Sequence, residues 1–296
     1  MTAPTVQEIA ALWAAAWPGR VPHPRGLADR LGDPSGWAWR RAGTGRLVAF
    51  AAFRPPEAYP HGHLRLLLTH PDVRGRGLGR ALVTEVWDRL GPVPLAVGEE
   101  RGHLLPGSPQ ESAAFFERVG FTRTGRVSVD MVCDLRAPLP AADLPPGLRL
   151  TDAREPGILP AVQDLTDAVF SARWTHDAGG VASRAGHQLL ALHSPERAVG
   201  FALVGVEDDP AVLPSFLFPD ALRAAVGASG PAGGLGPVGL HPDLRGNGLG
   251  RALMLAAMHH LRDRGAVVMG IDWTGIAPFY ERLGFRPWET YIHLRG

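Results

Sequence analysis

Hydrophobic residues along this chain follow two periods, and the periods alternate in the same order in both halves. Apolar positions three and four residues apart predict helices over residues 79–90 and 250–264, each followed by a glycine that suits a helix end. A short apolar run directly before each helix, at residues 64–69 and 237–240, predicts a strand. The pattern therefore predicts a strand, a turn and a helix in succession, twice.

The remaining hydrophobic runs predict a similar order of elements in the two halves. In the first half we expect helices at residues 8–17, 24–31 and 108–119, and strands at 37–40, 46–53, 93–97 and up to 135. In the second half we expect helices at residues 157–171, 181–186 and 276–283, and strands at 148–151, 188–193, 198–206, 266–272 and 286–294.

Prolines suggest where the chain divides. Residues 137–146 contain four prolines and predict an extended, semi-rigid linker between residues 1–136 and residues 147–296. Each part is large enough for a domain with its own core. Residues 207–234 have no counterpart in the first half. Their apolar content suits a loop that covers a substrate or lies between domains, and suits a structural insertion equally well.

The turns between the paired strands and helices carry a long internal repeat. Residues 70–82 recur as residues 241–253, with 11 of the 13 positions identical. Alternate glycines leave each turn without side chains, so the N–H groups at the helix start are open to an anion. The spacing differs from the dinucleotide fingerprint, and the lysine of a P-loop is missing. The repeat indicates two related units that each bind an anion.

The sequence of these turns resembles the acetyl-CoA signature of the GNAT acetyltransferases. The pattern Arg-x-x-Gly-x-Gly occurs at residues 74–79 and at residues 245–250. Each copy is followed by a second element that resembles the later helix of the family, which ends in Gly-Phe. These elements are Phe-Phe-Glu-Arg-Val-Gly-Phe at residues 115–121 and Phe-Tyr-Glu-Arg-Leu-Gly-Phe at residues 279–285. The resemblance covers nearly the whole chain and identifies it as a tandem GNAT protein.

This resemblance implies a fold and a cofactor. The fold class is α+β, with two GNAT-like domains, each a mixed, mostly antiparallel, splayed sheet flanked by helices. The co-substrate is acetyl-CoA, with its diphosphate on the glycine turn and its pantetheine arm along the preceding strand. The cofactor-binding residues implied in the second copy are Val238, Gly239, Leu240, Arg245, Gly246, Asn247, Gly248, Leu249, Gly250 and Arg251. Those implied in the first copy are Leu66, Leu67, Leu68, Arg74, Gly75, Arg76, Gly77, Leu78, Gly79 and Arg80.

The resemblance also implies a mechanism, in which an amine attacks the acetyl carbon directly and a tyrosine protonates the departing sulfur. The tyrosine position, four residues before the glycine of Gly-Phe, holds Tyr280 in the second copy and Phe116 in the first. Asp272 ends the strand across the expected gap and is the candidate general base. We therefore expect catalysis in residues 147–296, with the first domain non-catalytic.

Other functions remain open at this point. Both units could be acyl-CoA sensors or scaffold modules without turnover, which Phe116 fits and Tyr280 opposes. An aminoacyl-tRNA-dependent transferase is a third possibility, since some of those enzymes are also tandem GNAT-like folds. The intact turn motifs and the net charge of +1 argue against it. The amine substrate could be a small metabolite, an antibiotic, a peptide N-terminus or a lysine side chain.

Composition excludes several classes of protein. All 30 basic residues are arginine, so enzymes that need a Schiff-base or kinase lysine are excluded. The single cysteine, Cys133, allows no internal disulfide and favours a reducing cytoplasm. We expect no nucleic-acid partner and no membrane span, and a monomer or homodimer. We also expect no metal, because His61-x-His63 and His259-His260 have no third ligand at a recognisable spacing.

Overall fold

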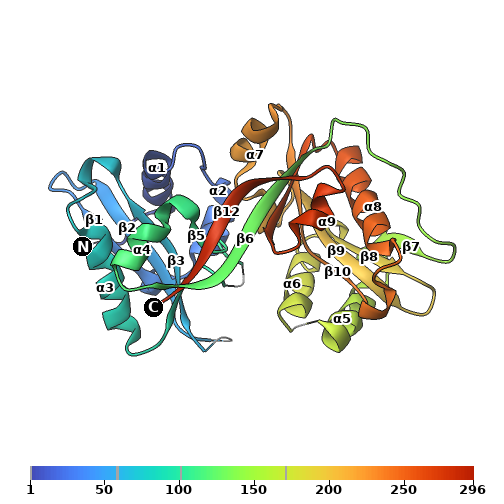
Figure 1. The fold of residues 1–296 in the computed structure, drawn as a ribbon, viewed down its shortest axis with the longest axis horizontal. Coiled ribbons are helices and arrows are strands. Elements are labelled where there is room, and N and C mark those ends of the chain that lie inside the picture. Colours follow the sequence, from blue (N-terminus) through green and yellow to red (C-terminus); the bar gives the residue numbers. More distant parts are fainter. Residues whose placement is uncertain (1, 58–59, 101, 171) are drawn as a thin grey trace. The chain divides into compact units, whose positions relative to one another are not determined.

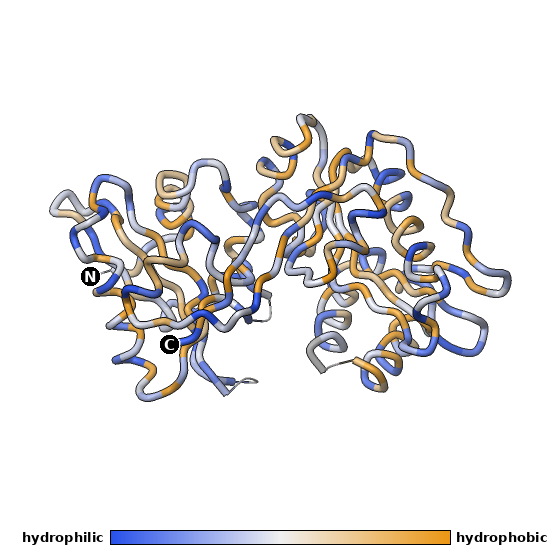
Figure 2. Tube along the Cα trace, viewed as in Figure 1, coloured by the Kyte–Doolittle hydropathy of each residue, from blue (hydrophilic) through white to orange (hydrophobic). Residues whose placement is uncertain are grey.

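The computed structural model describes residues 2–57, 60–100, 102–170 and 172–296. Contacts divide the chain into two compact units. The first unit contains Met1–Asp130, Trp273–Gly275 and Trp288–Gly296, and the second contains Met131–Asp272 and Ile276–Pro287. In both, hydrophobic residues concentrate along the central strands, while hydrophilic residues are frequent in the connecting loops (Figure 2).

The first unit is a mixed sheet with helices. Its helices are α1 (Val6–Ala16), α2 (Pro24–Leu31), α3 (Leu78–Leu90) and α4 (Ala113–Arg118). Its strands are β1 (Trp37–Arg41), β2 (Leu47–Arg54), β3 (Gly62–Thr69), β4 (Leu95–Val97), β5 (Ser108–Pro109) and most of β6 (Thr122–Asp134). Helix α1 begins two residues before the expected helix. Thr5 and Glu8 form a capping box that satisfies the first N–H groups.

The sheet of the first unit opens between two neighbouring strands. Strands β1, β2 and β3 pair antiparallel, and β3 then pairs parallel with β4. This parallel ladder ends at Leu64↔Val97, although β3 continues to Thr69. The last five residues of β3 therefore diverge from β4, as the splayed fold requires.

The second unit repeats this arrangement. Its helices are α5 (Ile158–Val169), α6 (Ala172–Ala182), α7 (Pro219–Val226), α8 (Leu249–Asp263) and α9 (Ala277–Glu281). Its strands are β7 (Arg149–Asp152), β8 (Leu189–His193), β9 (Ala198–Val206), β10 (Ala232–Leu240) and β11 (Val268–Thr274). Neighbours pair antiparallel except β10 and β11, whose parallel ladder ends at Leu235↔Ile271. The predicted α+β class and the mostly antiparallel, open sheet are confirmed.

The last strand, β12 (Arg286–Arg295), completes the sheet of the first unit. Leu95 and Gly296 exchange two backbone hydrogen bonds of 2.9 Å, and Ile292 and Leu294 belong to the hydrophobic core of the first unit. In Figure 1, β12 runs beside β6. The compact units therefore differ from the expected division at residues 137–146, because the end of the chain packs with the first unit.

Three expected elements were placed wrongly. The helix predicted over residues 108–119 is only α4, because Ser108–Pro109 forms a short strand paired with β12. The helix predicted over residues 181–186 lies earlier in the chain, as α6. The helix predicted over residues 157–171 ends at a residue that lies outside the described ones. The strand predicted at residues 237–240 begins at Ala232, because its first half consists mostly of glycine and gives no hydrophobic signal.

The segment without a counterpart, residues 207–234, packs into the second unit. Ser215 and Phe216 lie against three glycines of adjacent strands, Gly205, Gly234 and Gly270. A Cβ at Gly270 would lie 2.0 Å from the Ser215 carbonyl oxygen, so this contact needs glycine. The apolar residues of the segment are buried: Val212, Leu213, Phe216, Leu217 and Phe218. Of the open alternatives, this burial favours a structural insertion.

Candidate active site

The two glycine turns have almost the same backbone. Gly75 and Gly77 have φ of 77° and 78°, and Gly246 and Gly248 have φ of 86° and 87°. These values lie in the left-handed region, which favours glycine. A Cβ at any of the four would have no neighbour within 4 Å, so the turns are open to solvent. Helices α3 and α8 begin directly after the second glycine, and their first N–H groups have no acceptor within the helix.

The histidine before each turn caps the turn. His70 Nδ1 accepts a hydrogen bond from the N–H of Asp72, at 3.2 Å, and His241 Nδ1 accepts one from Asp243, at 3.4 Å. Both histidines thereby fix the short 3₁₀ turn that follows the strand. The same contact in both copies supports a structural role for these histidines.

The arginines around the turns divide into two groups. Arg74 Nε donates to the Thr69 carbonyl and its Nη2 to the Ala16 carbonyl, at 3.3 and 2.7 Å. Arg245 Nε donates to the Leu240 carbonyl at 3.2 Å, so both arginines brace the turn against the preceding strand. The remaining polar positions of the expected site are exposed on the turn or the helix start: Arg76, Arg80, Asn247 and Arg251.

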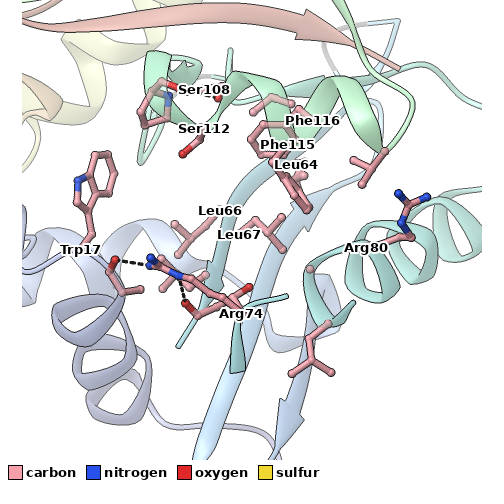
Figure 3. A pocket seen from close by; sticks show the side chains of 18 of the residues that line it. Trp17, Leu64, Leu66, Leu67, Arg74, Arg80, Ser108, Ser112, Phe115 and Phe116 are labelled. Atoms are coloured by element: carbon pink, nitrogen blue, oxygen red, sulfur yellow. Dashed lines mark hydrogen bonds between the residues drawn. The ribbon is translucent and has the colours of Figure 1, made fainter. Parts of the chain in front are cut away.

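A cavity of about 800 Å³ lies in the first unit, along the diverging part of β3. Figure 3 shows Leu66 and Leu67 from β3 and Phe115 and Phe116 from α4 around it. Nine of the ten residues expected in the first copy line this cavity: Leu66, Leu67, Leu68, Arg74, Gly75, Gly77, Leu78, Gly79 and Arg80. A volume of this size is within the range of cofactor pockets.

The aromatic residues of the Gly-Phe elements have the same arrangement in both units. The rings of Phe116 and Phe121 meet edge to face at 5.6 Å, and those of Tyr280 and Phe285 do so at 5.9 Å. The interplanar angles are 79° and 67°. Phe116 therefore occupies the position of Tyr280 in the first unit but lacks its hydroxyl.

Tyr280 is a buried phenol near a carboxylate. Its side chain belongs to α9, and the residue is 5% exposed. Burial and, secondarily, the negative charge of Asp272 raise the pKa of Tyr280 to about 12. The phenol is therefore protonated at neutral pH, and the carboxylate of Asp272 is close enough to influence it.

Asp272 lies where β10 and β11 part. A Cβ on Gly236 would lie 3.0 Å from Asp272 Oδ1, so the carboxylate packs against the backbone of Gly236. Gly236 precedes a cis peptide bond to Pro237 and follows Leu235, the last residue of β10 that pairs with β11. The structure thus places Asp272 at the mouth of the gap in the second unit.

The repeat identifies the residue that matches Asp272 in the first unit. Leu64 and Leu235 are equivalent in the repeat, and they pair with Val97 and Ile271 at the end of each parallel ladder. The next residue is Gly98 in the first unit and Asp272 in the second. The first unit therefore has no side chain at this position.

The residues one step further share an uncommon backbone. Glu99 has φ of 58° and Trp273 has φ of 48°, and they are the non-glycine residues with positive φ in the described part of the chain. Glu99 accepts a hydrogen bond from His293 and pairs with Arg295, while Glu100 pairs with Arg65. Both carboxylates beside Gly98 are thus bound to basic side chains.

Gly239 is required by aromatic packing that the sequence did not reveal. A Cβ there would lie 2.7 Å from both Phe170 and Phe201 and 3.0 Å from Trp174. Phe170 and Trp174 stack at 4.7 Å, and both meet Phe201 edge to face. The rings of these three residues therefore fill the space that a side chain at position 239 would need. Phe170 follows α5 directly, as Trp17 follows α1. The repeated order of helices could therefore have revealed that Phe170 and Trp17 occupy matching positions in the two units.

The described residues also bear on metal binding and on membrane insertion. Among them, no group of three or more histidine, cysteine, aspartate or glutamate side chains is placed to hold a metal ion. His259 Nε2 instead bonds to the carbonyl of Pro140, at 2.8 Å, in the proline-rich segment. Within the same residues, every helix is too short or too polar to span a bilayer.

Comparison with known proteins agrees with this geometry. Residues 35–123 match the model of an acetyltransferase (GNAT) domain, and residues 159–285 match that of the acetyltransferase (GNAT) family. The chain is 34% identical over 283 residues to the mycothiol acetyltransferase of Thermobispora bispora, which covers 91% of this chain and 87% of that protein.

Two solved structures share the fold across nearly the whole chain. The GCN5-related N-acetyltransferase from Sphaerobacter thermophilus has a TM-score of 0.71 at 21% identity, covering 99% of this chain and 94% of that one. A tandem GNAT protein from the clavulanic acid biosynthesis pathway has a TM-score of 0.68, with the same identity and coverage. With two family domains in one chain and a close relative along its length, this protein belongs to the GNAT family as a tandem N-acetyltransferase.

Proposed function

We propose that the second unit transfers an acetyl group from acetyl-CoA to the primary amine of a small molecule. The observation that carries this proposal is the difference between two matched sites. Both positions suited to proton transfer are filled in the second unit, by Tyr280 and Asp272. Their counterparts in the first unit are Phe116 and Gly98, which can move no proton.

Each step has a residue in the second unit. The diphosphate of acetyl-CoA binds the N–H groups of the turn at residues 246–251, where the positive end of α8 favours an anion. The backbone of residues 238–240 pairs with the pantetheine arm, because this part of β10 has left β11. Arg245 and Arg251 add positive charge beside the diphosphate.

The proton transfers then follow from the positions of the two side chains. Asp272 takes a proton from the ammonium of the acceptor, directly or through water, so that the neutral amine attacks the acetyl carbon. As the C–N bond forms and the C–S bond to CoA breaks, Tyr280 donates a hydrogen bond to the sulfur, where negative charge develops. The nitrogen releases its second proton to solvent, so the products are the amide and the CoA thiolate. Because the pKa of Tyr280 is about 12, above that of a thiol, its contribution is this hydrogen bond rather than strong acidity.

For the acceptor, we propose the free-amine form of mycothiol. The support is the name of the relative from Thermobispora bispora, at 34% identity over most of both chains. In the first unit, the cavity beside β3 supports binding of acyl-CoA without turnover.

A screen for CoA release tests the proposal. The protein is incubated with acetyl-CoA and each of a panel of amines, including the free-amine form of mycothiol, an amino sugar, a polyamine and a lysine peptide. We expect release with the mycothiol form and little with the lysine peptide. Release with the peptide alone would overturn the acceptor class, and release with no amine would favour a binding module.

A further inference from the structure

We infer that Asp130 is a positioning residue for acetyl transfer: it holds the backbone of Trp273 in the left-handed conformation that directs the carboxylate of Asp272 into the gap between β10 and β11. This inference rests on the proposed role of Asp272 as the base. Asp130 itself touches no reacting atom and acts only through the backbone next to Asp272.

The left-handed backbone at Trp273 needs a specific restraint. A bulky residue with φ of 48° is strained, and such a conformation persists only where its surroundings fix it. The matched residue of the first unit, Glu99, has nearly the same φ although its side chain has different chemistry. The shared conformation therefore belongs to the site where the sheet opens rather than to one residue type.

Asp130 supplies the restraint on the backbone. Its Oδ1 accepts the N–H of Trp273 at 2.8 Å, and Asp130 is only 6% exposed. A hydrogen bond from a backbone N–H to a buried carboxylate is among the stronger protein hydrogen bonds. This N–H belongs to the peptide bond between Asp272 and Trp273, so the bond fixes the peptide that carries the proposed base.

Two rings restrain the side chain of Trp273. Its indole stacks on His293 at 6.2 Å with an interplanar angle of 20°, and meets His103 edge to face at 5.0 Å. His293 is fully buried and is fixed in turn by Glu99 and by Ser128, whose hydroxyl lies 2.9 Å from Nε2. His293 therefore contacts both left-handed residues, one through a hydrogen bond and the other through stacking.

The consequence concerns the direction of one carboxylate. If the bond from Asp130 is lost, Trp273 can relax toward negative φ, which rotates the peptide at residues 272–273. The carboxylate of Asp272 then turns away from Gly236. In the first unit the same backbone follows Gly98, which has no side chain to direct.

Two substitutions at Asp130 separate the hydrogen bond from the charge. Asp130→Asn keeps an oxygen that can accept the N–H of Trp273, whereas Asp130→Ala removes it. For Asp130→Ala we expect kcat to fall about 10–100-fold with the KM for acetyl-CoA nearly unchanged, since a displaced catalytic group costs roughly this much. Asp130→Asn should retain kcat within about threefold of the parent, since its amide oxygen can still accept the N–H of Trp273. If Asp130→Ala does not fold, Asp130→Ser replaces it, because the serine side chain is too short for its hydroxyl to reach the N–H of Trp273.

The matched control is Asp209→Ala in the second unit. Asp209 is 5% exposed and also accepts a backbone N–H, from Val206 at 2.8 Å, but its other hydrogen bonds go to His187 and Arg264 rather than to the peptide that follows Asp272. Turnover per folded molecule should be unchanged in this variant. An equal loss in Asp209→Ala and Asp130→Ala would show general destabilisation and overturn the inference.

A double-mutant cycle with Asp272→Asn distinguishes the positioning role of Asp130 from the base role of Asp272. The assay is CoA release from acetyl-CoA with the free-amine form of mycothiol or whichever panel amine is accepted. We expect Asp130→Ala to lower kcat in the parent and to have no further effect in Asp272→Asn. A full further loss in that background would overturn the positioning role alone. Parent activity in Asp272→Asn would overturn the base assignment and the inference with it.

Discussion

The two units carry nearly the same backbone and differ in the side chains that chemistry needs. Their glycine turns agree within about ten degrees in φ, and their Gly-Phe aromatic pairs meet edge to face at similar distances. Yet Phe116 and Gly98 stand where the second unit has Tyr280 and Asp272. The two units thus share the features that suit cofactor binding and differ at the two positions proposed for proton transfer.

The difference extends to the surroundings of those positions. In the first unit the nearby carboxylates Glu99 and Glu100 are engaged by His293, Arg295 and Arg65. Although burial opposes it, these neighbours lower the pKa of Glu99, which keeps that carboxylate charged and paired. A carboxylate held in this way is a poor proton acceptor. The pairing of Glu99 thus distinguishes the surroundings of Gly98 from those of Asp272.

Blocking the glycine turns gives the largest expected effect and tests the comparison directly. In Gly248→Trp the indole occupies the place of the diphosphate, so acetyl-CoA binding to the second unit and all turnover should be lost. Gly77→Trp is the matched control, because its φ of 78° is similar to the 87° of Gly248 and both turns are open. Calorimetry with acetyl-CoA and CoA release measure the two effects. Loss of turnover in Gly77→Trp alone would reverse the assignment of the active unit.

Removing the proposed base gives the next largest effect. Asp272→Asn keeps the shape of the side chain and removes its ability to accept a proton, so we expect kcat to fall about 10²–10⁴-fold. Affinity for acetyl-CoA should be retained, since the turn at residues 246–251 is unchanged. Raising the pH should recover part of the loss, because the neutral form of the amine then becomes abundant in solution. A variant with full activity at neutral pH would contradict the assignment.

Removing the hydroxyl of Tyr280, the proposed hydrogen-bond donor to the sulfur, gives a smaller effect. Tyr280→Phe gives the second unit the residue that the first unit has at this position, and keeps the ring and its contact with Phe285. We expect kcat to fall roughly 10–10³-fold, at the lower part of the range for acid catalysis, because water can replace the phenol. The KM for acetyl-CoA should change little. Steady-state CoA release measures both constants, and a change confined to KM would point to a packing role.

Local sequence patterns predicted much of the fold because each strong signal had a local physical cause. The helices at Leu78–Leu90 and Leu249–Asp263 follow glycine turns and have clear apolar faces, so their prediction needed no tertiary information. The glycine-rich start of β10 gave no such signal. A Cβ at Gly234 would meet Ser215 and Phe216, and one at Gly233 would meet Ala266 and the Gly205 carbonyl, contacts that only the folded chain reveals. The sequence predicted a strand near β12 but not that it pairs within the first unit, because the fold of the whole chain decides which strands become neighbours.

The candidate site shows the same limit. The turn glycines and Tyr280 were identified from motifs, and the structure places nine of the ten first-copy residues around one cavity. The match between Gly98 and Asp272 required the strand pairing, because the sequence between the motifs differs in length. The left-handed backbone of Trp273 has no sequence signal at all, since tryptophan rarely adopts it.

Restoring the missing phenol in the first unit gives the smallest expected effect and sharpens the comparison most. Phe116→Tyr adds a hydroxyl beside the first-unit cavity, which Phe116 lines. In an otherwise unchanged protein we expect no change in kcat. In the Tyr280→Phe background we expect no recovery.

The reason is that an acid alone cannot complete the reaction. With Gly98 in place of a carboxylate, and with Glu99 and Glu100 engaged by basic side chains, the first unit has no counterpart of Asp272 to take the proton of the acceptor's ammonium. Tyr280→Phe alone is the baseline, and CoA release is measured at matched concentrations of folded protein. Recovery by Phe116→Tyr to a large share of parent activity would mean that the first unit already holds an acceptor site and a base. The two units would then differ by one hydroxyl rather than by a complete set of proton-transfer groups.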